Sequence, residues 1–419
     1  MSEPYHPKAF SRMDQSFLGA WWWTVDRALL AAILSLMILG VALVASASPA
    51  VAERIGAGGL HFLQKHLVFF VPSVFVVLGV SMFSPRIIWR AASILLLVMV
   101  VMLFFVLFAG SEIKGARRWI EIFGFSLQPS EFVKPSFTIV AARLISSHKG
   151  VSKALHEPSE KKRLLKNTLR PVFYSYHVAV MLYLFLITLL LAQPDLGMSV
   201  VLTLVFAVQI FLAGLRFRYL AILLTLGLVG LAIAYVSLSH VQSRVDRFFS
   251  PESGDNYQVE NALDAIRQGG LLGAGPGQGV EKNTIPDAHA DFIFPVLVEE
   301  MGVIISLLVL GLFLFVILRG FKRLRETQDI FCLLAAGGLL AMFGFQSLIH
   351  FGSSLNILPA KGMTLPFLSY GGSSLLSMAL SMGMVLALTR QRRRDSIARS
   401  SMTMRRARPA SISHSGENK

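Results

Sequence analysis

Cysteine and charge are both scarce in this sequence, and each scarcity excludes something. The single cysteine, Cys332, cannot form an intramolecular disulfide, and it gives no information about redox compartment. Only 15% of the residues are charged and 54% are hydrophobic, which leaves little room in 419 residues for a separate soluble domain. The composition therefore predicts an integral membrane protein.

Long charge-free runs predict where the chain crosses the bilayer. Each offers roughly the 20 apolar residues that a ~30 Å hydrocarbon core requires of a helix. The runs are continuous, whereas strands of a membrane barrel would be short and would alternate apolar with polar residues. We expect an all-α, polytopic protein with ten spans, of which the tenth, near 130–147, is interrupted by Glu131, Lys134 and Arg143. The other nine lie between Arg27 and Glu53, His66 and Arg86, Arg90 and Glu112, Arg170 and Asp195, Asp195 and Arg216, Arg218 and Arg244, Glu300 and Arg319, Asp329 and Lys361, and Lys361 and Arg390.

The loops between these spans carry unequal charge. With loops alternating across ten spans, one side holds 28 of the 39 Lys and Arg residues, including those of both termini. The positive-inside rule places that side in the cytoplasm, so the formal charge of +15 is largely a topology signal. No secretory signal peptide is expected before the first span, and Trp21, Trp22 and Trp23 suggest an interfacial anchor there.

We therefore divide the chain into three parts. Residues 1–26 form a cytoplasmic segment, 27–390 a ten-helix membrane domain with a large outer loop at about 240–290, and 391–419 a basic, disordered cytoplasmic tail. The tail is open to two interpretations, binding of nucleic acid or attraction to anionic lipid, and its position beside the last span favours lipid.

The outer loops hold several local signals. Asp195, in a short turn, is suited to cap the next helix. In the large loop, Asp255 can cap a short amphipathic helix with Val259, Leu263 and Ile266 on one face, ended by Gly269 and Gly270, which could lie on the membrane surface. The glycine-rich stretch 273–279 resembles a phosphate cradle, but no strand precedes it. A flexible hinge whose backbone N–H groups could meet an anion is the better interpretation.

Ionisable residues near spans are costly and mark candidate functional sites. One group comprises Lys114, Arg117, Arg118, Glu131 and Lys134. Glu131 and Lys134 are three residues apart and can pair on one helix face, either within a site or as a structural ion pair.

The second group lies where the large loop enters the eighth span, and consists of Asp287, His289, Asp291, Glu299 and Glu300. If this segment is helical, Asp291 and Glu299 lie about 80° apart and can face one cavity. Alternatively, Asp291 only favours the N-terminus of the helix electrostatically.

A third element, at 359–374, contains Lys361 among glycine and proline residues. Such backbone is non-helical and is tolerated only where protein or water covers it. The spacing of the three elements supports a polar, outward-facing site. The cations would suit a lipid-linked pyrophosphate and a carboxylate could remove a proton from an attacking hydroxyl, although spacing alone does not reach that chemistry.

Over about residues 25–390 the sequence resembles the SEDS family of bacterial cell-wall glycosyltransferases, most closely its cell-division branch. The resemblance rests on five segments in family order: Lys114-Gly-Ala-Arg-Arg-Trp-Ile with Gln128-Pro-Ser-Glu131, Gln193-Pro-Asp-Leu-Gly197, Ala288-His-Ala-Asp291-Phe-Ile-Phe294, Glu299-Glu300-Met-Gly302, and Leu358-Pro-Ala-Lys361-Gly-Met-Thr-Leu-Pro-Phe with Ser369-Tyr-Gly-Gly-Ser-Ser374. The sequence Lys361-Gly-Met-Thr364 favours the division branch over the elongation branch.

The resemblance implies polymerisation of lipid II into β-1,4 glycan at the outer face of the bacterial cytoplasmic membrane, at the division septum. It also implies a class B penicillin-binding protein, an FtsI-like transpeptidase, as partner, together with other divisome proteins. The family's essential aspartate corresponds to Asp291. The chain departs from the common pattern in having Ala290 in place of threonine and Asp287 in place of glutamate, and Arg117 stands where the family varies.

We therefore predict an inverting lipid II polymerase in which Asp291 is the general base. Cations would stabilise the departing undecaprenyl pyrophosphate. The candidates are Lys361, Arg118 and Lys114, then Arg117 and Lys134, with Glu131, His289 and Glu299 as further site residues. A divalent cation such as Mg²⁺ or Mn²⁺ could share this role, although no ligand set of recognisable spacing is present. The alternatives are a lipid II flippase and a non-catalytic scaffold for the transpeptidase.

Overall fold

The computed structural model describes residues 16–113, 116–122, 124–147, 169–214, 217–237, 242–243, 246, 248, 257–359 and 362–390. The chain divides into two units, residues 28–389 and the two flanking segments 1–27 and 390–419. In the flanking unit, the guanidinium of Arg27 lies 5.6 Å from the ring centroid of Trp22 and 5.2 Å from that of Trp23, next to the short helix α1 (Phe17–Trp22).

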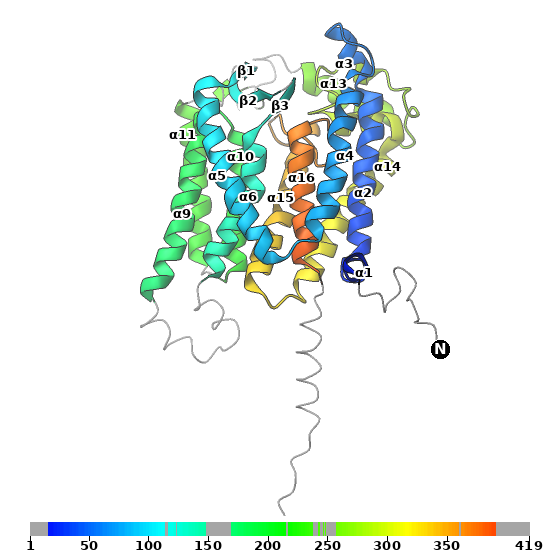
Figure 1. Cartoon of the computed structure of the whole chain (residues 1–419). Coiled ribbons are helices and arrows are strands. Elements are labelled where there is room, and N and C mark those ends of the chain that lie inside the picture. Colours follow the sequence, from blue (N-terminus) through cyan, green and yellow to red (C-terminus); the bar gives the residue numbers. More distant parts are fainter. Residues whose placement is uncertain are drawn as a thin grey trace, which may run out of the picture. The chain divides into compact units, whose positions relative to one another are not determined.

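Residues 28–389 form a bundle of long helices that run between two ends (Figure 1). The helices are α2 (Arg27–Ala47), α4 (His61–Ser81), α5 (Pro85–Ala109), α6 (Pro129–Ser146), α9 (Leu169–Ala192), α10 (Leu196–Leu212), α11 (Phe217–Ser237), α14 (Ile293–Leu324), α15 (Ile330–Ser354) and α16 (Gly372–Leu388). Five of them, α2, α4, α5, α14 and α15, are long and apolar enough to cross a membrane by length and composition, and shorter apolar helices occur at Tyr176–Ala192, Leu196–Leu212, Thr225–Ser237 and Gly372–Leu388.

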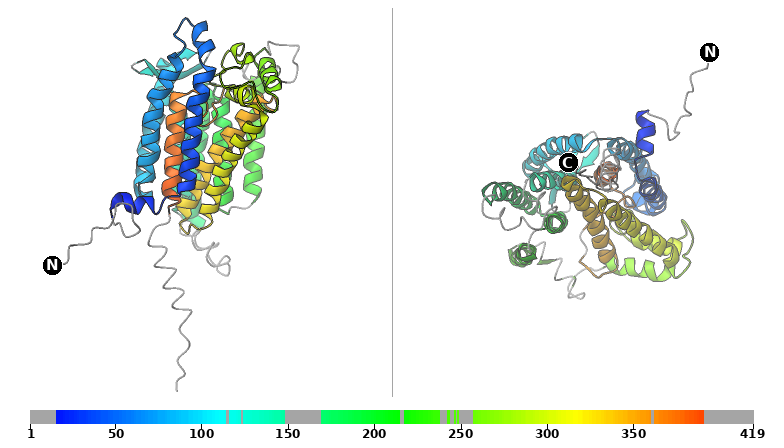
Figure 2. Two further views of the ribbon diagram at one scale, coloured as in Figure 1. Left: turned by 90° about the vertical axis from the view of Figure 1, so that its right-hand side faces the viewer. Right: turned by 90° about the horizontal axis from the view of Figure 1, so that it is seen from below.

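Burial separates inner helices from outer ones. α15 and α16 are buried along most of their length, and α16 packs against α4, α6 and α15 (Figures 1 and 2). The outer helices instead leave large apolar side chains uncovered, among them Phe75, Phe108, Val236 and Leu308. Exposed apolar faces of this extent in a helical bundle are those that meet lipid.

One end of the bundle carries a small antiparallel sheet, which the sequence analysis did not predict (Figure 1). Its strands are β1 (Ser111–Ile113), β2 (Ala116–Ile122) and β3 (Phe125–Leu127), in the order β1-β2-β3, with Ile120 opposite Leu127. The all-α prediction therefore holds for the bundle but not for this segment. The short helices α3 (Pro49–Arg54) and α13 (Tyr257–Gly269) lie at the same end.

The helix predicted from Val259, Leu263 and Ile266 is present as α13, although its expected cap, Asp255, lies outside the described residues. α13 packs against α14. Its side chains Val259 and Leu263 line a cavity. Its expected position on the membrane surface stays a prediction.

Part of the glycine-rich stretch contacts α14 directly, and its expected role as a flexible hinge stays a prediction. α14 is broken at Gly302, whose φ of 76° and ψ of 172° are not helical. A Cβ on Gly302 would lie 2.3 Å from the carbonyl oxygen of Leu271, and one on Gly273 would lie 2.3 Å from that of Glu300. The N–H of Gly275 donates to the Glu300 carbonyl at 2.9 Å. The glycines thus permit direct backbone contact between the loop and the break in the helix.

Candidate active site

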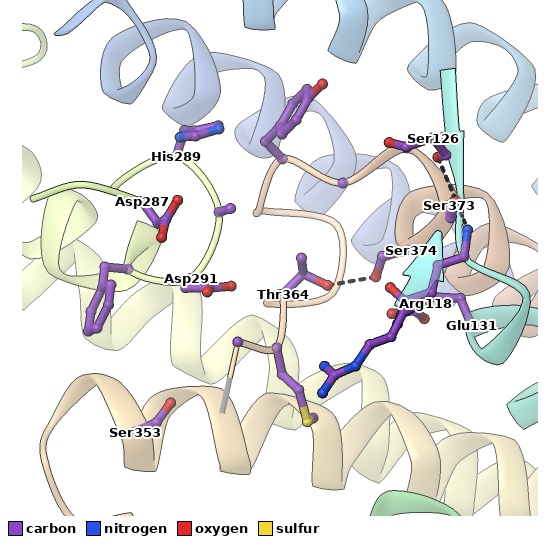
Figure 3. A pocket seen from close by; sticks show the side chains of 18 of the residues that line it. Arg118, Ser126, Glu131, Asp287, His289, Asp291, Ser353, Thr364, Ser373 and Ser374 are labelled. Atoms are coloured by element: carbon purple, nitrogen blue, oxygen red, sulfur yellow. Dashed lines mark hydrogen bonds between the residues drawn. The ribbon is translucent and has the colours of Figure 1, made fainter. Parts of the chain in front are cut away.

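A cavity of about 1080 Å³ opens at the end of the bundle that carries the sheet (Figure 3). Its walls come from α4, the β2–β3 hairpin, the start of α6, α13, the segment 287–292, Pro359 and the segment 362–374. Segments that are far apart in the sequence therefore converge on one space. Of the expected site residues, Arg118, Glu131, His289 and Asp291 line it.

Asp291 is held in this wall by backbone contacts of the turn that precedes α14. The N–H groups of Ala290 and Asp291 donate to the carbonyl of Asp287 at 3.0 and 3.1 Å. The hydroxyl of Ser369 donates to the Ala290 carbonyl at 2.6 Å and accepts from the N–H of Leu365 at 2.8 Å. These bonds tie the turn to the segment that follows Gly362.

The carboxylate of Asp291 is half-buried and points into the cavity, toward Thr364 (Figure 3). A Cβ on Gly362 would lie 3.4 Å from Asp291 Oδ2, so the backbone at 362 passes directly beside the carboxylate. A carboxylate in this setting is reachable from the cavity, as a general base must be.

His289 forms an aromatic cluster on the same wall. Its ring lies 4.3 Å from that of Phe62 and 5.1 Å from that of Tyr370, centroid to centroid. The Tyr370 N–H donates to the His289 carbonyl at 2.8 Å, a second tie between the two segments. Burial raises the pKa of the Tyr370 phenol, so this ring stays neutral within the cluster.

Arg118 reaches the cavity from β2, but its guanidinium is already bonded to protein. Its Nε donates to the carbonyl of Gln193 at 3.0 Å, its Nη2 donates to the carbonyl of Pro194, and its Nη1 lies 3.8 Å from Asp195 Oδ1. Arg118 therefore fixes the turn between α9 and α10 beside the cavity. Asp195 also accepts from the N–H of Met198 at 3.4 Å, which confirms its expected role as the cap of α10.

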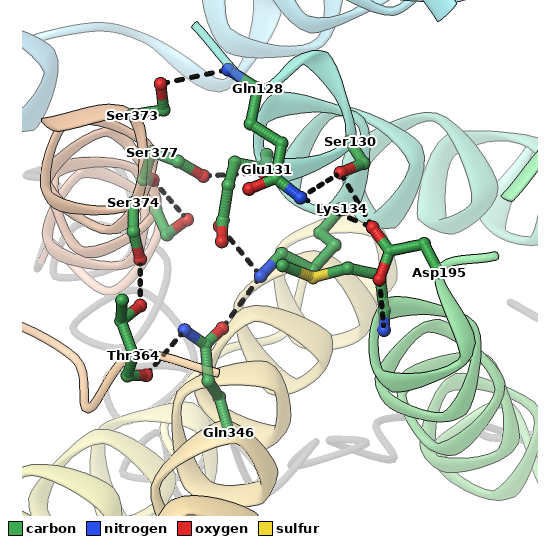
Figure 4. Close-up of polar contacts among 12 residues, drawn as sticks. Gln128, Ser130, Glu131, Lys134, Asp195, Gln346, Thr364, Ser373, Ser374 and Ser377 are labelled. Atoms are coloured by element: carbon green, nitrogen blue, oxygen red, sulfur yellow. Dashed lines mark hydrogen bonds and ion pairs between the residues drawn. The ribbon is translucent and has the colours of Figure 1, made fainter. Parts of the chain in front are cut away.

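A polar network links two residues that line the cavity, Glu131 and Thr364, through the buried Lys134 and Gln346 (Figure 4). The ammonium of Lys134 lies 2.8 Å from Glu131 Oε2 and 2.8 Å from Gln346 Oε1. The Gln346 amide donates to the carbonyl of Thr364 at 3.1 Å, and the Thr364 hydroxyl lies 2.7 Å from that of Ser374. The expected pairing of Glu131 with Lys134 is confirmed. Lys134 is 1% exposed and does not line the cavity, which favours the structural interpretation of the pair.

Glu299 is placed differently from the expectation. α14 begins at Ile293, so Asp291 precedes the helix and the angle expected for a continuous helix does not apply. Glu299 is fully buried, and its carboxylate accepts from the N–H groups of Glu281 and Lys282 at 2.7 and 2.9 Å. Its neighbour Glu300 pairs with the ammonium of Lys282. Both glutamates hold the large loop against α14, and neither lines the cavity.

Three candidates remain, Lys114, Lys361 and Arg117. Lys114 and Lys361 lie outside the described residues. Arg117 is exposed and does not line the cavity, as expected for a residue next to Arg118 on a strand, where successive side chains point to opposite faces.

Several lining residues were missed by the sequence analysis. Lys65 lies on α4 and lines the cavity, as do the hydroxyls of Thr364, Ser373 and Ser374. The sequence offered a signal for Lys65. It lies between Phe62 and Phe69 at helical spacing, on a face that also contains His66, and this pattern indicates a lysine on an inward-facing side of a span. Thr364, Ser373 and Ser374 lie in segments that carried the family resemblance, but nothing in their spacing marks their hydroxyls as cavity-lining groups.

Comparison with known proteins adds the decisive observation. Residues 27–394 match a family described as cell cycle protein, which is named after FtsW, RodA and SpoVE. The chain belongs to this family. The SEDS resemblance is thereby confirmed, and the protein crosses the membrane several times, as this family's fold and the apolar helices require.

The relatives lie in the division branch. The chain is 41% identical to the probable peptidoglycan glycosyltransferase FtsW of Caulobacter vibrioides, over 92% of this chain and 94% of the relative. It is 33% identical to the protein of the same name in Coxiella burnetii, over 87% and 96%.

Solved structures agree with the fold of the family. A chain from a study of polymerisation and crosslinking by a peptidoglycan synthase complex matches with a TM-score of 0.68 and 26% identity, over 88% of this chain and 98% of that chain. The rod shape determining protein RodA of Thermus thermophilus matches with a TM-score of 0.61 at 24% identity, over 88% and 97%.

Proposed function

We propose that this protein is an inverting glycosyltransferase that polymerises lipid II into β-1,4 glycan at the outer face of the cytoplasmic membrane during cell division. The observation that carries the proposal is the Asp291 carboxylate, which is half-buried and directed into an open cavity by the bonds of Ser369 and Tyr370 to its turn. The names of the relatives, which describe a probable peptidoglycan glycosyltransferase, support the same activity.

In the proposed step, Asp291 takes the proton from the sugar hydroxyl of the acceptor lipid II. The hydroxyl oxygen bonds to the anomeric carbon of the growing chain, and the bond from that carbon to the diphosphate oxygen breaks. Undecaprenyl pyrophosphate leaves with the bonding electrons. General base catalysis typically supplies roughly 10²–10⁴-fold, and cations at the departing diphosphate stabilise its developing charge. For that second role we retain Lys361 and Lys114 from the sequence analysis.

The cavity geometry favours an enzyme over a flippase. A flippase needs a polar route through the whole bilayer, because charged headgroups cannot cross hydrocarbon unaided. The cavity is instead lined from the sheet, α13 and the loops at one end of the bundle. A scaffold without activity would need no accessible carboxylate at this position.

We further propose a ten-span topology with both termini in the cytoplasm, a position at the division septum, and an FtsI-like class B penicillin-binding protein and other divisome proteins as partners. The positive-inside distribution of Lys and Arg supports the topology. A structural relative that comes from a complex combining polymerisation with crosslinking supports the partnership.

The test uses purified full-length protein in detergent micelles, with and without its transpeptidase, given fluorescent lipid II. Long glycan strands are expected, and their length distribution can be read by gel electrophoresis. Micelles have no second leaflet, so a flippase yields no product. Absence of polymer in both arms, with lipid II still bound, would remove the proposed activity.

A further inference from the structure

Lys65 lies on the α4 wall of the cavity, between two aromatic residues that each pack against another wall. Phe62, three residues before Lys65, packs on the ring of His289 with centroids 4.3 Å apart. Phe69, four residues after it, packs on Phe125 with centroids 5.3 Å apart. Residues at these spacings share one helix face. Lys65 therefore lies midway between the wall that carries Asp291 and the wall formed by the hairpin.

A lysine near a membrane surface commonly extends toward lipid headgroups, with its alkyl chain along the hydrocarbon. The burial pattern of α4 argues against that role here. Leu67, Val68 and Val71 are 40–53% exposed and mark the lipid-facing side of the helix. Lys65 is half-buried, lines the cavity, and precedes His66, which is buried. Its side chain thus belongs to the inward face.

Lys65 has no described carboxylate partner, in contrast to Lys134, Lys282 and Arg118. Lys134 pairs with Glu131 and Lys282 pairs with Glu300. Arg118 is bonded to the turn at Asp195. Within the described residues, no carboxylate is at ion-pairing distance from Lys65, although Glu131, Glu260, Asp287 and Asp291 also line the cavity.

A half-buried ammonium without a counter-ion in a cavity is stabilised by an anion that enters the cavity. We propose that Lys65 binds the diphosphate of a lipid-linked substrate, and that Arg118 is a positioning residue that holds the turn at 193–195. The inference rests on the proposed function, and it places one diphosphate contact on α4, between the wall that carries Asp291 and the wall formed by the hairpin.

Binding of undecaprenyl pyrophosphate to the full-length protein tests this assignment, with undecaprenol as the uncharged comparison. Lys65→Gln is expected to weaken binding of the diphosphate lipid by about tenfold to a hundredfold, the usual effect of losing one hydrogen bond between charged groups. Binding of undecaprenol should not change. Lys65→Arg should retain most of the affinity. Lys322→Gln, the same change at an exposed lysine at the far end of α14, serves as the matched control.

Three outcomes would overturn the assignment. The first is an unchanged affinity of Lys65→Gln for the diphosphate lipid. The second is an equal fall in affinity for undecaprenol, which would assign the lysine to binding of the lipid chain or to folding. Weaker binding of lipid II, without weaker binding of undecaprenyl pyrophosphate, would assign it to carboxylates of the stem peptide. Folding is checked by the unfolding temperature, which should stay near that of the wild type.

The binding assay is independent of polymerisation. If the wild-type protein binds the diphosphate lipid through Lys65 but forms no glycan, the proposed function fails and the assignment of Lys65 stands. If glycan forms and Lys65→Gln leaves both binding and the KM for lipid II unchanged, the assignment fails and the proposed function stands.

Discussion

Removing one partner of the Glu131–Lys134 pair should destabilise the protein far more than removing both. The two side chains are 5% and 1% exposed, and their charged atoms are 2.8 Å apart. Lys134→Met leaves the Glu131 carboxylate without its ammonium partner. Glu131→Gln leaves a buried ammonium with Gln346 Oε1 as its remaining described partner, at 2.8 Å. Breaking a buried pair by removing one member costs roughly 3–5 kcal/mol, whereas replacing both members is often close to neutral.

A double-mutant cycle in mixed micelles, with equilibrium unfolding driven by SDS, measures this coupling. If the two losses were independent, the double variant Glu131→Gln/Lys134→Met would lose roughly 6–10 kcal/mol. We expect it instead to lie within about 2 kcal/mol of the wild type, because no unpaired charge remains buried. Additive losses, or single variants as stable as the wild type, would refute the interpretation of the pair as a buried structural element.

Two further predictions concern the segments around the cavity. Gly302→Ala should lower the free energy of unfolding by more than about 3 kcal/mol, because its Cβ would meet the Leu271 carbonyl and its φ is positive. Gly311→Ala in the same helix, whose Cβ would meet nothing within 4 Å, should change that free energy by less than about 1 kcal/mol. Equal effects of the two substitutions in SDS unfolding would contradict the close contact proposed at Gly302. Ser369→Ala should lower the kcat for glycan formation about tenfold or more with little change in KM, because it releases the turn that carries Asp291. Ser93→Ala is the control, because the Ser93 hydroxyl bonds within α5. An unchanged kcat for Ser369→Ala would show that the turn is held without Ser369.

What the sequence predicted correctly depends on local spacing. The apolar runs located helices because length and hydrophobicity are properties of contiguous residues. The α13 helix, the cap formed by Asp195 and the pairing of Glu131 with Lys134 depend on residues within one or two turns. Some of the residues that line the cavity, such as Arg118, His289 and Thr364, also lie in the motifs that carried the resemblance.

What the sequence did not predict depends on contacts between distant segments. The sheet formed by β1, β2 and β3 was not predicted, because its strands are short and carry charges among their apolar residues. Glu299 was expected in the cavity because the helix was extended back to Asp291, and its real partners are N–H groups 17 and 18 residues earlier in the chain. The close backbone contact between Gly273 and Gly302 depends on a break in α14 that the sequence analysis did not predict.

The glycan-forming rate of Asp291→Asn tests the central claim most directly. The substitution preserves the size of the side chain and removes the basic oxygen, while the bonds that hold the turn come from the backbone and from Ser369. Asp264→Asn, the same change at an exposed position of α13 outside the cavity, is the control. With lipid II binding retained, we expect the rate for Asp291→Asn to fall by roughly 10²–10⁴-fold and that for Asp264→Asn to stay unchanged. A rate for Asp291→Asn equal to that of the wild type would contradict the account.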